Sequence, residues 1–154
     1  MKAIRDLFFD QLRELHGLAT RVGTGLPPLG RLATEPRLAS IIDRQGEDSI
    51  SHYQALLAIF TYHDEVPNTG EGKALEAVLE ESRLHAGLID DPTARDINLV
   101  GHCLRLCHHQ IASLVMARRL AQRLGWNEEA GILEILADEE ILTAEELLML
   151  EHEL

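Results

Sequence analysis

The stretch LASIIDRQGEDSISHYQALLAI, residues 38–59, decides the fold of this chain. Residues on one face of this stretch recur at alternating spacings of three and four, as in amphipathic helices that pack in bundles. The positions that follow this spacing are Leu38, Ile41, Gln45, Asp48, His52, Ala55 and Ile59. The outer positions are apolar and the three central ones are polar. The stretch therefore predicts a long helix whose inner face carries a polar segment.

The same spacing of apolar residues appears in three other parts of the chain, over residues 8–22, 97–121 and 133–150. Four long amphipathic helices of this kind predict an all-α fold, a four-helix bundle. A shorter helix is expected between the second and third long ones, because residues 72–89 are rich in helix formers.

Glycine, proline and capping residues divide the chain. We expect helices over about residues 3–22, 35–64, 72–89, 92–124 and from 127 almost to the end. The run GTGLPPLG at 23–30 is expected to end the first helix, and VPNTG at 66–70 is expected to be a loop. Asp91 before Pro92 is typical of a helix N-terminus, and Gly125 is typical of a C-terminus.

Length and composition narrow the class of protein. The 154 residues suit one domain, 1–154, and the 45% of apolar residues is enough for a core. The formal net charge of −12 argues against nucleic acid and against anionic membrane surfaces as partners. The longest apolar run, Ala55–Phe60, is far too short to span a membrane, and no export signal is recognisable. We therefore expect a cytoplasmic location.

Polar residues on the inner faces are the candidate functional residues. Burying an unpaired carboxylate is costly, so Asp48, His52 and Glu140 are expected to have partners. Cys107 and His108 lie near the middle of the fourth helix. Carboxylates and imidazoles that meet inside a four-helix bundle are the ingredients of a di-iron site.

A di-metal carboxylate site also needs a specific motif, which this chain lacks. The usual site takes one Glu from each of two helices and a Glu-x-x-His motif from each of the other two. The residues three positions before the eight histidines are Arg13, Ser49, Phe60, Ser82, Leu99, Arg105, Leu106 and Met149. None of them is Glu, so the standard motif is absent.

Several short segments resemble one family in their order and spacing. They are DLFFDQLRELH at 6–16, GLPPLG at 25–30, ATEPRL at 33–38, PTARD at 92–96, CHHQIA at 107–112, LAQRLG at 120–125 and DEE at 138–140. Together they resemble the YciE/YciF type of ferritin-like protein, a bacterial family linked to stress responses. The resemblance covers nearly the whole chain and implies a ferritin-like four-helix bundle.

The resemblance also implies where the inner ligand-type residues of the family fall. A first-helix Glu falls on Ala19, and the two carboxylates of a fourth-helix Glu-His-Tyr-Glu segment fall on Cys107 and Gln110. The second-helix acidic pair is kept in Glu47 and Asp48, with His52 four residues after the latter. The fifth-helix pair is kept in Glu139 and Glu140, and an Asp four residues later falls on Ala144. Much of the oxygen-rich ligand set that iron prefers is therefore replaced.

These observations favour a non-catalytic protein with a degenerate di-metal site. We expect a structural or interaction role, linked to stress by the resemblance alone, in a homodimer or with an unknown protein partner, and without a cofactor. In the alternative interpretation, a reduced site formed by some of Asp48, His52, Cys107, His108 and Glu140 binds a single iron, manganese or zinc ion for redox chemistry or sequestration.

Overall fold

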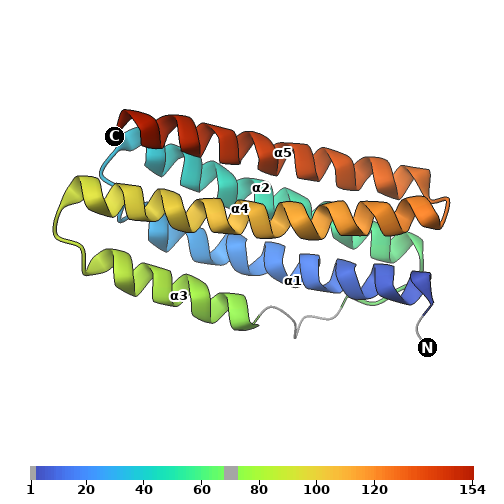
Figure 1. Ribbon diagram of the computed structural model, residues 1–154. Helices are drawn as coiled ribbons and strands as arrows, with labels where there is room; N and C mark the ends of the chain where they lie inside the picture. Colours follow the sequence, from blue (N-terminus) through green and yellow to red (C-terminus); the bar gives the residue numbers. More distant parts are fainter. Residues whose placement is uncertain (1–2, 68–72) are drawn as a thin grey trace.

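The computed structural model describes residues 3–67 and 73–154 and shows five helices and no strand in these residues (Figure 1). The helices are α1 (Ile4–Gly30), α2 (Pro36–Tyr62), α3 (Lys73–Gly87), α4 (Pro92–Arg123) and α5 (Asn127–Glu153). The predicted all-helical class and the short helix before the third long one are confirmed. Of the loop predicted at 66–70, residues 68–70 lie outside the described part of the chain.

The four long helices lie side by side, and α3 lies outside them (Figure 1). α1 packs against α2 and α4, and α5 packs against α4 and α2. Among the described helices, α3 contacts α1 and α4. α1 and α2 run in opposite directions, as do α4 and α5, whereas α2 and α4 run in the same direction (Figure 1). This parallel pair requires a long crossover between α2 and α4, and α3 is part of that crossover.

The first helix is longer than predicted. The expected end at residues 23–30 is wrong, because α1 continues to Gly30 with Pro27 and Pro28 in its last turns. Each proline removes one backbone donor from the helix. Leu26 and Leu29 are almost fully buried in the same turns. Burial of these side chains therefore holds the segment helical against the local preference of its prolines.

Two glycines permit a close approach of α1 and α2. A Cβ atom added at Gly23 would lie 3.3 Å from Ile50 Cγ1 and 3.7 Å from the Gly46 carbonyl oxygen. A Cβ atom added at Gly46 would lie 3.8 Å from Leu26 Cβ. A methyl group at Gly46 would make ordinary contacts, and one at Gly23 would require the Ile50 side chain to shift by a few tenths of an ångström. Both glycines thus lie where α1 and α2 pack closely, inside the helices and not at their ends.

The two predicted capping residues, Asp91 and Gly125, are found at the ends of α4, and Glu35 is a further cap that the structure adds. The Asp91 carboxylate accepts a 2.7 Å hydrogen bond from Ala94 N at the start of α4, and Glu35 is the N-cap of α2. Gly125 follows α4 with a φ of 72°, a left-handed conformation that glycine adopts without strain.

A buried carboxylate fixes the turn between α1 and α2. Asp96, near the start of α4, accepts hydrogen bonds from Thr34 N and Glu35 N at 2.9 Å and from Thr34 Oγ1 at 2.6 Å. Three donors of one short connection thus meet one side chain of another helix. This contact fixes the N-terminus of α2 relative to α4.

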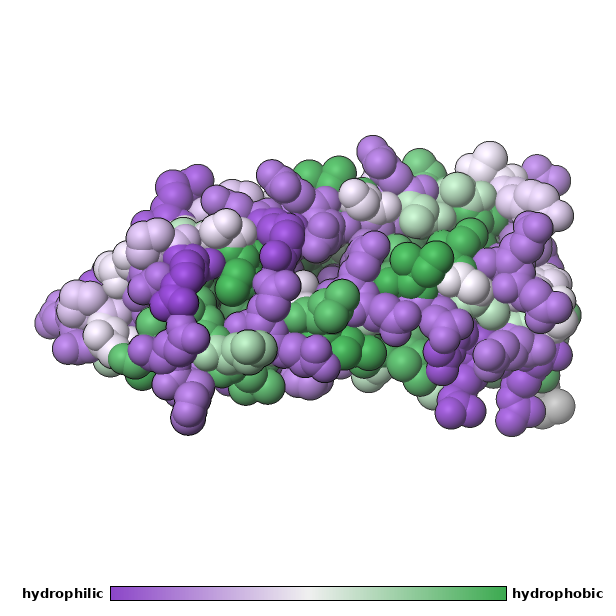
Figure 2. All heavy atoms as spheres, turned by 90° about the horizontal axis from the view of Figure 1, so that it is seen from above, coloured by the Kyte–Doolittle hydropathy of each residue, from purple (hydrophilic) through white to green (hydrophobic). Residues whose placement is uncertain are grey.

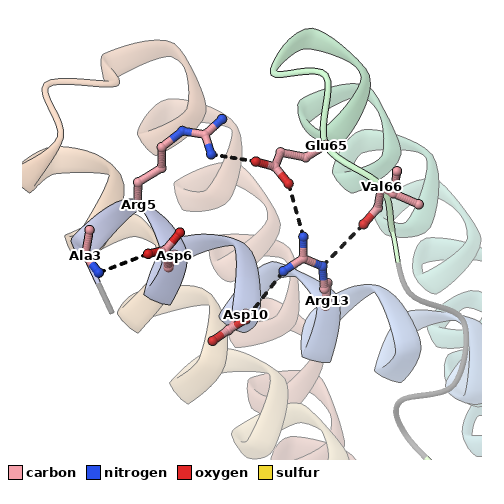
Figure 3. A network of polar contacts seen from close by, with 7 residues as sticks. All are labelled: Ala3, Arg5, Asp6, Asp10, Arg13, Glu65 and Val66. Atoms are coloured by element: carbon pink, nitrogen blue, oxygen red, sulfur yellow. Dashed lines mark hydrogen bonds and ion pairs between the residues drawn. The ribbon is translucent and has the colours of Figure 1, made fainter. Parts of the chain in front are cut away.

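A second polar network joins the start of α1 to the segment after α2 (Figure 3). Glu65 accepts from Arg5 Nη1 at 2.5 Å and from Arg13 Nη2 at 3.2 Å. Arg13 Nε also donates to the Val66 carbonyl at 3.3 Å. The network holds the chain against α1 as it leaves α2 toward the crossover.

The apolar interior consists of two clusters. One, at the end of the bundle that contains the α1 N-terminus, is rich in aromatic residues and includes Phe8, Phe9 and Phe60. The other is aliphatic and includes Leu26, Ile42 and Leu147. Along each long helix, buried polar residues lie between the members of the two clusters. The core is therefore interrupted at mid-height by a polar layer.

Candidate functional site

The inner polar layer is built from buried polar side chains of all four long helices. Its members are His16 of α1, Gln45, Ser49 and His52 of α2, Gln110 of α4, and Glu140 and Thr143 of α5. The periodicity of each helix turns these residues inward together with the neighbouring apolar residues. Because water cannot solvate them there, each of their polar atoms that lacks a hydrogen-bond partner costs stability.

Glu140 lies at the centre of this layer, with only 2% of its surface exposed. With the amide nitrogen of Gln110 facing the carboxylate, Gln110 donates to Glu140 Oε1 at 3.2 Å and to Oε2 at 3.0 Å. Burial raises the pKa of Glu140 to about 8, and the charges of Asp48 and Glu139 act in the same direction. A hydrogen bond with Cys107 opposes this shift. Glu140 is thus mostly protonated at neutral pH.

His52 connects α2 to both carboxylates of α5. Its Nε2 lies 2.7 Å from Glu139 Oε2, and its Nδ1 lies 3.6 Å from Glu140 Oε1. Asp48 lies one turn before His52 and is only half-buried. Burial and the charge of Glu139 raise the pKa of Asp48. The structure therefore brings His52 and Glu140 together as predicted and places Asp48 at the edge of the layer.

Cys107 and His108 point to different environments. Cys107 is fully buried, and its Sγ accepts a 3.2 Å hydrogen bond from Gln45 Nε2. Burial and the neighbouring Glu140 raise the pKa of this thiol well above its usual range. His108, the next residue, is exposed on α4. Of this pair, only Cys107 belongs to the interior.

Gln45 has a second polar atom that the layer leaves unsatisfied. Its Oε1 is buried without a hydrogen-bond partner, while its backbone carbonyl accepts from Ser49 Oγ at 2.9 Å. An unpaired buried amide oxygen costs stability, of the order of 1–3 kcal/mol. The layer is therefore not fully satisfied.

His16 is an inner residue that the candidate site did not include. It is 2% exposed, and its ring lies 4.4 Å from that of Tyr53, with both ring nitrogens lacking hydrogen-bond partners. Burial lowers its pKa, so the ring is neutral. The signal was available in the spacing, because His16 follows Leu12 by four residues and precedes Ala19 by three. Gln110 follows Cys107 by three residues and precedes Leu114 by four, so its spacing also turns it inward.

The residues present do not fit a di-metal centre. Across residues 3–67 and 73–154, no group of three or more His, Cys, Asp or Glu side chains is arranged to hold a metal ion. Ala19, Cys107 and Gln110, where the resemblance implies carboxylates, are all buried. These positions therefore face inward as ligands would, but their side chains do not supply the oxygen atoms that such a centre needs.

Comparison with known proteins identifies a family and similar folds. The sequence profile described as "Domain of unknown function (DUF892)" matches residues 3–154. The structure is similar to YcfI, a candidate structural protein from Rhodopseudomonas palustris, with a TM-score of 0.88 at 22% identity over 95% of this chain and 93% of that one. It is also similar to the E. coli stress protein YciF, with a TM-score of 0.90 at 22% identity over 98% and 96% of the two chains.

Because both identities are low, these similarities establish the all-helical fold and nothing further. Comparison with curated proteins gives no match. In the described part of the chain, no helix combines the length and apolarity that crossing a membrane requires.

Proposed function

The chain belongs to the DUF892 family, and from this premise we propose that it is a ferritin-like helical protein without a working di-metal centre. It serves as a structural or interaction protein that associates with a second copy of itself in the cytoplasm. The similarity to YcfI and to the stress protein YciF supports a structural role and a role under stress.

The bonding of Glu140 carries the proposal. In a di-metal centre, carboxylates in the middle of the bundle are neutralised by metal ions. Here both oxygens of Glu140 are within hydrogen-bond distance of the Gln110 amide nitrogen, and burial favours the protonated carboxyl. The Gln110 amide and the carboxyl proton thus take the place of the positive charge that metal ions would supply. The layer can stabilise the fold without a metal.

The outer face of α5 supports association. Ile135, Leu142 and Met149 follow one another at intervals of seven residues and are 60%, 58% and 71% exposed. Ile141 and Leu148 are also exposed and broaden the stripe. Figure 2 shows the face of the molecule that carries α5, where hydrophobic groups lie between hydrophilic ones. A stripe with a seven-residue repeat suits packing against another helix, and a two-fold axis would bring the same stripe from a second copy.

The acidic residues on this face of α5 allow self-association to be tested through its dependence on salt. Acidic residues lie on the same face of α5, where Glu134, Asp138 and Glu145 fall between the row of Ile135, Leu142 and Met149 and the row of Ile141 and Leu148. Two copies would bring like charges together, and salt would screen their repulsion. Sedimentation velocity at micromolar concentration should show a species of twice the 17.2 kDa chain mass that increases with salt. Leu142→Glu should abolish it, whereas Val78→Glu, on exposed α3, should not. A single 17.2 kDa species for the parent would overturn the association.

Metal content tests the absence of a working centre. Protein purified without chelator is analysed for iron, manganese and zinc beside an Asp48→Ala/His52→Ala variant. The proposal expects far less than one ion per chain in both. About one ion per chain that the variant loses would instead establish the alternative, a reduced site that binds a single ion through Asp48, His52 and Glu140, with Cys107 or His108 as a further ligand.

A further inference from the structure

A groove separates part of α3 from the bundle and is unrelated to the inner polar layer. It encloses about 440 Å³, which is within the usual range of small-molecule sites. Its apolar wall is formed by leucines of three helices, Leu18 of α1, Leu75 and Leu79 of α3, and Leu106 of α4. We call it the α3 groove.

The polar residues of the α3 groove lie at its ends. At one end, Ser82 Oγ of α3 lies 3.0 Å from His102 Nδ1 of α4. At the other end, His109 of α4 approaches Glu14 of α1, with 3.9 Å between Nε2 and Oε1. Residues 102 and 109 are seven apart on one helix, so the ends are separated by about 10 Å. The apolar wall lies between them.

Arg105 supplies a positive charge that no carboxylate neutralises. It lines the groove one turn from His102, and its Nη2 donates to His102 Nδ1 at 2.7 Å. Within the described residues, Arg105 hydrogen-bonds to this imidazole, and no acidic residue lies within ion-pair distance of its guanidinium. A guanidinium has five N–H donors, so most of them stay available. Seven other arginines of this acidic protein, in contrast, form ion pairs with carboxylates.

His102 is held neutral beside this charge. Burial lowers its pKa, and the nearby Arg105 and His85 lower it further. Because Nδ1 accepts from Arg105, the proton of the neutral ring is on Nε2, and Nε2 is buried without a partner. This end of the groove therefore offers the N–H donors and the positive charge of Arg105.

We propose that the α3 groove binds a small amphipathic carboxylate, whose oxygens accept from Arg105 while its hydrocarbon chain lies against the leucines of the wall. Guanidinium groups bind carboxylates through paired N–H donors, and an apolar wall of this length shields a short hydrocarbon chain from water. The overall charge of −12 repels anions, so binding depends on this local arrangement. This ligand site goes beyond the structural role proposed above.

The probe is octanoate, titrated into the full chain and followed residue by residue in ¹H–¹⁵N NMR spectra. Saturable shifts are expected at residues 75–82 of α3 and 102–109 of α4. Acetate, which lacks the chain, and 1-octanol, which lacks the charge, should each bind at least about tenfold more weakly, since each loses one of the two interactions. These comparisons use the parent protein and do not depend on the folding of any variant.

Two matched variants test whether the charge of Arg105 is responsible for octanoate binding. Arg105→Gln should weaken octanoate binding about tenfold or more, because a charge-assisted hydrogen bond is lost. Arg119→Gln removes the same charge from the same helix outside the groove and should leave binding unchanged. No saturable shift with octanoate, equal binding of 1-octanol, or an equal effect of the two variants would overturn the proposal.

Discussion

The inner polar layer and the α3 groove contain similar groups, yet their polar atoms are satisfied in different ways. In the layer, Glu140 meets the Gln110 amide and His52 meets Glu139. In the groove, Arg105 meets only a neutral imidazole within the described residues. A group that is buried must find its partner inside the protein, whereas a group at an open groove can keep its hydrogen-bonding capacity for a ligand. The comparison separates groups that stabilise the fold from groups that can recognise a ligand.

The largest expected effect concerns the charge of Glu140. Its pKa in the folded protein is about 8, above its ordinary value of 4.5, so between these pH values the folded state holds a proton that the unfolded state has lost. The free energy of unfolding therefore falls as pH rises through this window, by at most about 1.4 kcal/mol per pH unit. Glu140→Gln should remove most of this slope and be about 2–4 kcal/mol more stable than the parent at pH 8.

Urea unfolding from pH 5 to pH 8 measures this effect. The groups that face Glu140 are Asp48 and His52 of α2, Cys107 of α4 and Glu139 of α5. The raised pKa of Asp48 acts with the same sign, so a small slope should remain in Glu140→Gln. Glu139→Gln, whose side chain is 44% exposed, is the control and should retain most of the slope. If the free energy of unfolding changed equally with pH in the parent and in Glu140→Gln, the prediction would be wrong, and the layer would tolerate a charged Glu140.

The next effect concerns the amide that meets Glu140. Gln110→Ala should lower the free energy of unfolding by about 2–3 kcal/mol, because it leaves a cavity and removes the hydrogen bonds of a buried carboxyl. His109→Ala changes the adjacent exposed residue, which lines the groove, and should stay within about 0.5 kcal/mol of the parent. Denaturant unfolding measures both variants, and an equal loss of free energy of unfolding in the two would contradict the distinction between the layer and the groove.

The smallest effect is expected at Arg105. Arg105→Gln should change the free energy of unfolding by less than about 0.5 kcal/mol, because the side chain is exposed and its partner is neutral. It should raise the pKa of His102, since the guanidinium lowers that pKa, while the larger contribution of burial remains. Urea unfolding and an NMR titration of the His102 ring measure the two effects. A loss of several kcal/mol would mean that Arg105 holds α3 in place.

The sequence predicted the helices well because their signals are local. The spacing of apolar residues in 38–59, the Asp91-Pro92 cap and Gly125 each act within one or two turns, and the structure confirms the helix and both ends of α4. The buried face of α2 is displaced by one residue in places, since Ile42, Ser49 and Leu56 are buried and their predicted neighbours Ile41, Asp48 and Ala55 only partly so. The prediction for the segment at residues 23–30 was wrong for the opposite reason. Its glycines and prolines favour a break locally, but the burial of Leu26 and Leu29 and the close approach of Gly23 to Gly46 hold it helical.

The candidate site was predicted in part. The spacing correctly predicted that His52, Cys107 and Glu140 face inward, because helical periodicity alone decides which face a residue occupies. It placed Asp48 on the same face, although this residue is only half-buried, and it did not show that His108 is exposed. The candidate site omitted His16 and Gln110, although their spacing turns them inward, because what they contact depends on other helices.

The sequence by itself therefore determined the all-helical class, the order of the helices and most inward-facing residues, since propensity, capping and periodicity are properties of a single helix. Only the tertiary structure decided that Gln110 meets Glu140, that α1 continues past Gly23, and that Arg105 lines an open groove beside α3. The physical reason is that hydrogen bonds between helices and the burial of side chains depend on which helices are neighbours and at what height, and no local spacing encodes that arrangement.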